Sequence, residues 1–187
     1  MRSSQPIGQQ EATEQFEELY REHYRKILAY ARRRTHSIED ANDVTAATFT
    51  VAWRKLDALV GADEPLAWLY GVAYRTVLSQ RRAVAKGPRL AEKIAAQPVA
   101  AVESIESTVA TRDQLERATA AAETLSEADR EILRLVGWED LSNAEVAEIL
   151  GISKPLARTR LLRARRRLQT AYAKSQHDPP TGGTPCD

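Results

Sequence analysis

The chain has 187 residues, of which 43% are hydrophobic and 28% charged, and its formal net charge is +1. These values are typical of an ordinary globular protein with one or two small domains. The sequence has no run of about 18 apolar residues and its start lacks the apolar core of a signal peptide, so no membrane span is expected. The single cysteine, Cys186, cannot form an internal disulfide, which favours the reducing cytoplasm as the location.

The first two predicted helices follow from apolar periodicity. Between residues 16 and 31, apolar residues recur at three- and four-residue steps and predict one helix. Ser37 is expected to cap a second helix over residues 38–59. That helix carries two apolar stripes, which suit either a central position in a bundle or a partner bound on its outer side. The stripes are Val44, Thr48 and Val51, and Phe49, Trp53 and Leu56.

A third helix is predicted after a short loop. Asp63 is the expected cap, and Pro65 fits the first turn because its nitrogen needs no hydrogen-bond acceptor there. One face of this helix is apolar, through Leu66, Leu69, Tyr70, Ala73 and Val77. Another face mixes aromatic and cationic residues, namely Trp68, Tyr74, Arg75, Ser79, Arg81 and Arg82. Such a face can hold unpaired nucleic acid by stacking and charge, although Trp68 and Tyr74 can equally belong to the core of a small bundle.

A second group of helices is predicted in the last third of the chain. Ser142 and Glu145 have the spacing of a capping box, which starts a short helix over 143–150. Gly151 supplies the left-handed residue that ends this helix, and Ser153 caps the last one. Two further helices are expected before them, over 112–125 and 127–138.

The sequence therefore predicts an all-α protein with two small helical domains joined by a flexible linker. The first domain covers residues 13–86 and the second covers 110–173. The linker, 87–109, contains glycine, prolines and many alanines and has weak periodicity. The arm 1–12 and the tail 174–187 are expected to be disordered.

Charge is distributed unevenly over the second domain. From Lys154 to Lys174 there are eight lysines or arginines and no acid. From Glu123 to Glu148 there are eight acids and two arginines. An acidic block folded against a basic helix leaves one basic face, which can bind phosphates.

The last two helices have the pattern of a helix-turn-helix. The inner apolar stripe of the second helix is Ala157, Leu161, Ala164 and Leu168. The cations that this stripe leaves outward near the helix start are Lys154, Arg158, Arg160 and Arg163. In this motif the start of the second helix enters the major groove, where arginine pairs with guanine or holds phosphate. The opposing interpretation is that these cations form a solvated face or pair with the acidic block.

No catalytic constellation is apparent in the sequence. The three histidines, His23, His36 and His177, lack the spacing of metal ligands, and one cysteine gives no Cys/His cluster. There is no phosphate-binding G-x-x-x-x-G-K-[ST] loop. We therefore expect no enzyme activity, no catalytic residues, no metal and no cofactor.

Taken together, these motifs resemble the extracytoplasmic-function subfamily of the sigma-70 family, the sigma factors of bacterial RNA polymerase. The segments FEELYREHYRKILAYARRR, IEDANDVTAATFTVAWRKLDAL and EPLAWLYGVAYRTVLSQRR resemble the three parts of sigma region 2. The segment TLSEADREILRLVGWEDLSNAEVAEILGISKPLARTRLLRARRRL resembles region 4. The resemblance covers most of residues 16–170, in order and at the expected spacing.

The resemblance implies a role for each part in promoter-specific transcription initiation. The second helix of region 2 would dock on the clamp helices of the largest polymerase subunit, with candidates Asp40, Asp43, Phe49 and Trp53. The third helix and its preceding loop would melt and read the minus-ten element, through Asp63, Glu64, Trp68, Tyr74, Arg75, Ser79 and Arg82. The last helix would read the minus-thirty-five element in duplex form, through Ser153, Lys154, Leu156, Ala157, Arg158, Arg160 and Arg163. The flap of the second-largest subunit and an anti-sigma factor are further implied partners.

Three places depart from the family pattern. Ala46 and Ala47 stand where a Gln-Glu pair that contacts the polymerase is usual. Arg75 stands where an asparagine is usual, at the opened minus-ten strand. In the last helix, Pro155-Leu156-Ala157 stands where Gly-Thr-Val is usual. Because leucine can touch a thymine methyl, this change suggests an atypical minus-thirty-five preference.

Two interpretations from other classes stay open. A stand-alone helix-turn-helix regulator would bind operator DNA as a dimer, with half-sites about one DNA turn apart. A helical adaptor would bind only protein and keep the DNA-binding fold as a relic. The bipartite layout and the docking helix favour the sigma factor, whereas Ala46 and Ala47 are the strongest argument against it.

Overall fold

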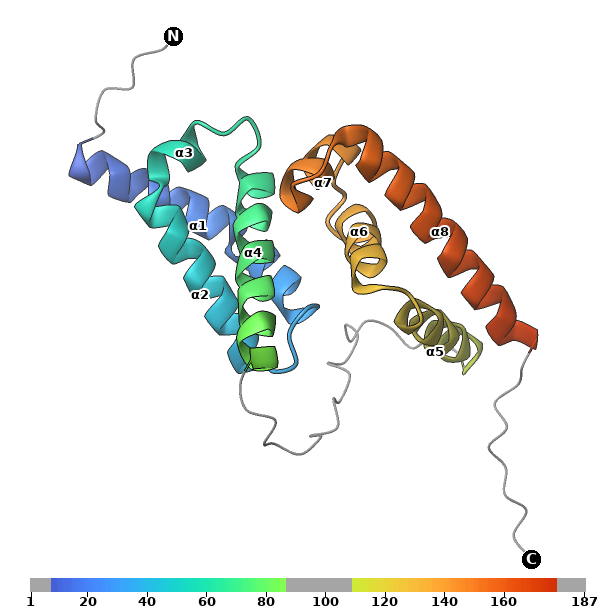
Figure 1. Cartoon of the computed structure of the whole chain (residues 1–187). Coiled ribbons are helices and arrows are strands. Elements are labelled where there is room, and N and C mark those ends of the chain that lie inside the picture. Colours follow the sequence, from blue (N-terminus) through green and yellow to red (C-terminus); the bar gives the residue numbers. More distant parts are fainter. Residues whose placement is uncertain (1–7, 87–108, 178–187) are drawn as a thin grey trace, which may run out of the picture. The chain divides into compact units, whose positions relative to one another are not determined.

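The structure, a computed structural model, describes residues 8–86 and 109–177 (Figure 1). All regular elements in these residues are α-helices, eight in number, which confirms the expected all-α fold. They form two compact units, one on each side of the undescribed segment. The linker residues 87–108, most of the expected arm and tail, and Cys186 lie outside the described residues.

The first unit consists of α1 (Gln9–Arg32), α2 (Ile38–Arg54), α3 (Leu56–Val60) and α4 (Pro65–Lys86). α1 packs against α2 and α4, α2 also packs against α4, and the short α3 lies on α4. The rings of Tyr30 and Tyr70 lie 5.1 Å apart and join α1 to α4. The core between these helices includes Ile27, Tyr30, Val44, Leu59 and Leu69.

Local chemistry sets the starts of α2 and α4. The Ser37 hydroxyl accepts a hydrogen bond from the Asp40 N–H at 3.0 Å, which confirms the expected cap of α2. α4 begins at Pro65, as expected. The cap position of α4 is Glu64 rather than Asp63, because the Glu64 carbonyl accepts the first helical bond, from the Trp68 N–H at 3.1 Å.

The second helix differs from the sequence-based expectation. It does not continue to residue 59, because the backbone leaves helical geometry at Lys55 (φ −125°, ψ 37°) and α3 follows as a separate helix. After this break, Leu56 and Leu59 are buried in the core, whereas Trp53 stays 44% exposed. Trp53 and Leu56 therefore lie in different environments, although helical periodicity put them on one stripe.

The second unit consists of α5 (Val109–Glu123), α6 (Glu127–Gly137), α7 (Asn143–Leu150) and α8 (Lys154–His177). α8 runs the length of this unit and packs against the other three helices (Figure 1). Ser126 caps α6, since its hydroxyl accepts from the Asp129 N–H at 3.2 Å. The core of the unit includes Ile132, Leu135, Val146, Ala157 and Ala164.

The outer helices of both units are longer than the sequence suggested. α1 begins at Gln9, inside the expected arm, and the Thr13 hydroxyl donates to the Gln9 carbonyl at 2.9 Å. α8 continues to His177 instead of ending near residue 173, and the Ser175 hydroxyl donates to the Tyr172 carbonyl at 2.8 Å. Hydrogen bonding within a helix continues past the last residue that packs in the core. The boundaries predicted from composition therefore made α1 begin too late and α8 end too early.

Candidate nucleic-acid and polymerase interfaces

Three local interactions set the helix-turn-helix between α7 and α8. The Ser142 hydroxyl accepts from the Glu145 N–H at 3.3 Å, and the Glu145 carboxylate accepts from the Ser142 N–H at 2.7 Å, which completes the capping box. Gly151 has φ +65°, a left-handed conformation that favours glycine. The Ser153 hydroxyl accepts from the Leu156 N–H at 3.4 Å at the start of α8. All three sequence-based expectations for this turn are confirmed.

One face of α8 is buried within its own unit. Ala157, Leu161 and Ala164 are buried and Leu168 is half-buried, which confirms the predicted inner stripe. Ala157 has no exposed surface, so its side chain belongs to the core and the expectation that it contacts DNA is wrong. Its small side chain suits the close packing of α8 against its neighbours.

The remaining surface of α8 presents cations and two leucines. Exposed cations near its start are Lys154, Arg158 and Arg163, with Arg160 half-buried at the edge of the packed face. Leu156 and Leu162 are 45% and 51% exposed. The sequence pattern did not single out Leu162, which belongs neither to the inner stripe nor to the set of outward cations.

An ion pair joins the acidic block to α8. Arg167 pairs with Asp129, whose carboxylate is buried between the two helices. Within residues 109–177, Arg158 and Arg163 form no ion pair. The interpretation that α8 neutralises the acidic block therefore holds for Arg167 and fails for the exposed arginines near the helix start.

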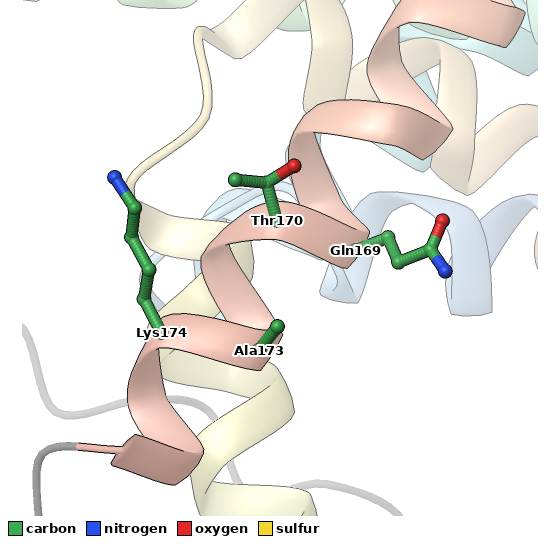
Figure 2. Close-up of a pocket in the computed structure, with 4 residues that line it drawn as sticks. All are labelled: Gln169, Thr170, Ala173 and Lys174. Carbon is green, nitrogen blue, oxygen red and sulfur yellow. The ribbon is translucent and has the colours of Figure 1, made fainter.

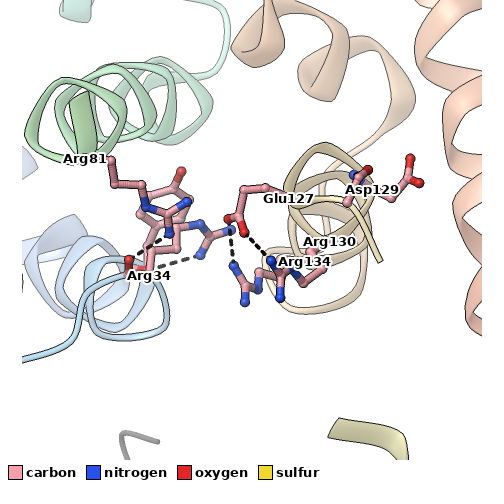
Figure 3. Close-up of polar contacts among 8 residues, drawn as sticks. Arg34, Arg81, Glu127, Asp129, Arg130 and Arg134 are labelled. Carbon is pink, nitrogen blue, oxygen red and sulfur yellow. Dashed lines mark hydrogen bonds and ion pairs between the residues drawn. The ribbon is translucent and has the colours of Figure 1, made fainter. Parts of the chain in front are cut away.

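Other arginines make contacts inside their own units (Figure 3). In the second unit, Glu127 pairs with Arg130 at 3.0 Å and with Arg134 at 3.5 Å on the same helix. In the first unit, Arg81 donates to the carbonyl of Arg34 at 2.9 Å and joins α4 to the segment after α1. Arg81, which the sequence put beside the candidate DNA-binding face, therefore has a structural contact.

The candidate minus-ten face lies on α4 and the loop before it. Its exposed members are Asp63, Glu64, Arg75, Ser79 and Arg82, and its half-buried members are Trp68 and Tyr74. The guanidinium of Arg75 folds back over Gly71, where an added Cβ would lie 3.5 Å from it. Half-burial is compatible with both interpretations of Trp68 and Tyr74, since a ring can pack on the helix and keep one accessible edge.

The outer side of α1 and α2 carries five aromatic rings in contact, which we call the aromatic cluster. Neighbouring ring centroids lie 4.7 to 6.4 Å apart, and Trp53 meets Phe16 edge-on at 5.1 Å. Phe49 is only 4% exposed and supports the cluster from below, whereas Trp53 and Tyr20 are 44% and 40% exposed. The members of the aromatic cluster are Phe16, Tyr20, Tyr24, Phe49 and Trp53.

The α1 members of the aromatic cluster were not among the predicted site residues. Their four-residue spacing indicated only an apolar stripe, because periodicity does not tell an internal face from an external one. A groove of about 730 Å³ runs along them, lined by Phe16, Glu17, Tyr20, Arg21, Tyr24 and Arg25. On α2, the predicted docking residues Asp40 and Asp43 are exposed.

A shallow depression of about 430 Å³ lies on the last turns of α8 (Figure 2). It is lined by Gln169, Thr170, Ala173 and Lys174, none of which is an acid, a histidine or a cysteine. Within residues 8–86 and 109–177, no group of three or more such side chains is arranged to hold a metal ion. The helices described here include none that is long and apolar enough to cross a membrane.

The fold and the interfaces define a class of protein with two helical units, one of which carries a DNA-binding helix-turn-helix. Residues 19–86 match the family described as Sigma-70 region 2, and residues 115–168 match Sigma-70, region 4. The first match ends with α4, and the second extends from α5 into α8.

Two curated relatives are sigma factors. The RNA polymerase sigma factor YlaC of Bacillus subtilis (strain 168) is 31% identical over 170 residues, covering 87% of this chain and 94% of the relative. The ECF RNA polymerase sigma factor SigG of Mycobacterium tuberculosis is 28% identical over 168 residues, covering 78% of this chain and 45% of the relative. The chain belongs to the sigma-70 family of RNA polymerase sigma factors, in the extracytoplasmic-function (ECF) subfamily. The stand-alone dimeric regulator is therefore not the function of this chain.

Two solved structures have the same fold. The sigma factor RpoE, in complex with the anti-sigma factor NepR from Bartonella quintana, gives a TM-score of 0.63 at 24% identity, over 84% of this chain and 96% of that one. CnrH, in complex with the cytosolic domain of CnrY, gives 0.57 at 23% identity, over 90% of this chain and 96% of that one.

Proposed function

We propose that this sigma factor divides promoter recognition between its two domains. Residues 13–86 bind core RNA polymerase and melt the minus-ten element, and residues 110–173 read the minus-thirty-five element. Residues 87–109 link the two; of the expected arm (1–12) and tail (174–187), residues 9–12 belong to α1 and residues 174–177 belong to α8. The observation that carries the proposal is α8, a helix that buries one face, follows a glycine turn and presents exposed cations at its start.

α8 enters the major groove of the minus-thirty-five element. Lys154 and Arg158, exposed in the first two turns, suit phosphate contacts or a bidentate contact with guanine. Arg160 emerges at the edge of the packed face, where its stem is partly covered and its reach is limited. The proposed contact residues are Ser153, Lys154, Leu156, Arg158, Arg160 and Arg163.

α4 and the loop before it hold the opened strand of the minus-ten element. Half-buried aromatic rings are rigid stacking platforms for unpaired bases, and neighbouring arginines hold the backbone. Arg75 replaces the usual asparagine and folds over Gly71, which supports an altered base preference at this point of the strand. The proposed contact residues are Asp63, Glu64, Trp68, Tyr74, Arg75, Ser79 and Arg82.

The outer face of α2 docks on the clamp helices of the largest polymerase subunit. Trp53 is the main apolar contact, because it is exposed whereas Phe49, also in the aromatic cluster, is buried. Asp40 and Asp43 supply exposed negative charge on the same helix. The usual polar pair is absent at Ala46 and Ala47, and the exposed aromatic area beside them offers apolar contact instead.

Further partners follow from the same assignment. The flap of the second-largest subunit would bind the second domain, and an anti-sigma factor would cover the basic face of α8. Two solved structures support the proposal of an anti-sigma partner. In one, RpoE is in complex with the anti-sigma factor NepR, and in the other, CnrH is in complex with the cytosolic domain of CnrY. We place the protein in the cytoplasm with core polymerase, and we assign it no catalysis, since the polymerase performs the synthesis.

Run-off transcription tests this function directly. Purified core polymerase is incubated with a promoter library, with and without this protein. Transcripts that appear only with the protein, from starts that share two spaced upstream elements, are the expected result. Binding to DNA without binding to core polymerase would contradict the proposal and would mark Ala46 and Ala47 as lost docking contacts.

A further inference from the structure

Two leucines interrupt the polar surface of α8. Leu156 and Leu162 each expose about half of their surface, whereas the adjacent Ala157 and Leu161 are buried. Each exposed leucine has an arginine one turn away on the same helix surface, Arg160 for Leu156 and Arg158 for Leu162. Single exposed leucines are common on protein surfaces. Here both lie on the cationic helix that is proposed to enter DNA, where an apolar group of the DNA would cover them.

The spacing of the two leucines suits a helix that lies in a groove. Six residues correspond to a rise of about 9 Å along the helix axis and leave the side chains about 120° apart around it. The buried stripe of Ala157, Leu161 and Ala164 occupies the inner side, so the leucines lie on opposite flanks of the outward side. When the outward side faces the floor of the groove, both flanks lie next to base edges. At about 3.4 Å per base pair, a rise of 9 Å corresponds to about three base pairs.

The major groove offers one apolar group on its base edges, the C5 methyl of thymine. We propose that Leu156 and Leu162 each pack against a thymine methyl of the minus-thirty-five element, at two positions about three base pairs apart. This inference rests on the proposed function of α8. It goes beyond the arginines, which hold phosphate or select guanine, because a methyl contact distinguishes thymine from the other three bases.

Uracil substitution tests the inference with full-length protein and core polymerase. Each thymine on either strand of a library-selected minus-thirty-five element is replaced singly by uracil, which removes only the methyl group. Promoter affinity is measured at one fixed salt concentration. We expect about a fourfold loss at two positions, the value for removing one buried methyl. The loss at one position should disappear in Leu156→Ala and the loss at the other in Leu162→Ala.

Matched controls separate the leucine contacts from general weakening. Arg163→Ala should lower affinity for every DNA and leave both uracil losses in place, because it removes charge and not apolar surface. Thymines in the minus-ten element should respond to uracil equally in all variants. Both leucines are exposed, so alanine should not change the melting temperature of the protein.

Several results would overturn the inference. The first is a selected minus-thirty-five element that contains no thymine. The second is a promoter affinity that uracil changes at no position. The third is a loss of affinity on uracil substitution that persists in the double variant Leu156→Ala/Leu162→Ala. Weaker binding of the leucine variants to core polymerase alone would assign the leucines to a protein contact instead. If the wild-type holoenzyme bound no promoter selectively, the proposed function itself would fail, which the wild-type measurement reveals independently of every variant.

Discussion

The substitution Trp53→Ala tests whether the aromatic cluster binds core polymerase. Trp53 is 44% exposed, and its ring packs edge-on against Phe16 at 5.1 Å. A tryptophan side chain buries up to about 250 Å², so covering the exposed part removes about 110 Å² from water. At about 25 cal/mol per Å², this burial contributes about 2.7 kcal/mol, or about a hundredfold in the Kd for core polymerase.

The same substitution has a smaller effect on folding. Truncating a fully buried tryptophan costs about 3–5 kcal/mol, so the half-buried Trp53 should cost about 2 kcal/mol of unfolding free energy. Phe49 remains beneath the site and keeps α1 and α2 in contact. The variant should therefore stay folded while its binding to polymerase falls.

Two measurements on each variant separate these effects. Fluorescence anisotropy of the labelled protein gives the Kd for core polymerase, and circular dichroism gives the melting temperature. Val60→Ala is the matched control, because Val60 is 43% exposed on α3 and outside the aromatic cluster. A folded Trp53→Ala protein with a Kd within about threefold of wild type would refute the docking argument. An unfolded variant would show that Trp53 is a core residue.

Three further predictions concern single residues. If Arg158 reads a base, Arg158→Ala should weaken promoter binding by about 1–3 kcal/mol at one base position. If Arg158 holds phosphate, the loss should be the same for all sequences, and the slope of log affinity against log salt concentration should fall by about one. Unchanged affinity and slope would remove Arg158 from the interface. Ser142→Ala should lower the unfolding free energy by about 0.5–2 kcal/mol in urea titrations, because the Glu145 N–H loses its acceptor. Burial lowers the pKa of His23 below its ordinary value of 6.5. His23 of the unfolded chain therefore binds a proton more readily than His23 of the folded protein. The unfolding free energy should decrease as the pH falls below about 6.5 and should not depend on His23 above that pH. His23→Gln should remove this pH dependence, and an unchanged pH dependence would contradict the assignment.

Local signals predicted the turn of the helix-turn-helix correctly. The capping box, Gly151 and the Ser153 cap follow from residue types at fixed spacing, and the structure has all three. These features depend on hydrogen bonds between residues within four positions of one another, so no tertiary information is needed. The order of the region 2 and region 4 segments likewise indicated the family from the residue pattern alone.

Predictions that depended on which helix face is covered were less successful. Ala157 was assigned both to the core and to DNA, and only packing shows that it is buried. The helix expected over 38–59 breaks at Lys55, and α3 then carries its leucines into the core. Tyr20 follows the apolar periodicity of residues 16–31 and is nevertheless 40% exposed, in the aromatic cluster. Periodicity identifies residues that share a face, but neighbouring helices determine whether that face is buried.

The sequence by itself determined that this protein is all-helical, that its last helix is basic, and that its motifs occur in the order of a sigma factor. The tertiary structure decided which side chains remain available to a ligand. Leu161 and Leu162 are adjacent and chemically identical, yet the first is buried and the second is half exposed. The physical reason is that one residue turns the side chain by about 100° around the helix, and α8 is covered by the other helices of its unit on one side only.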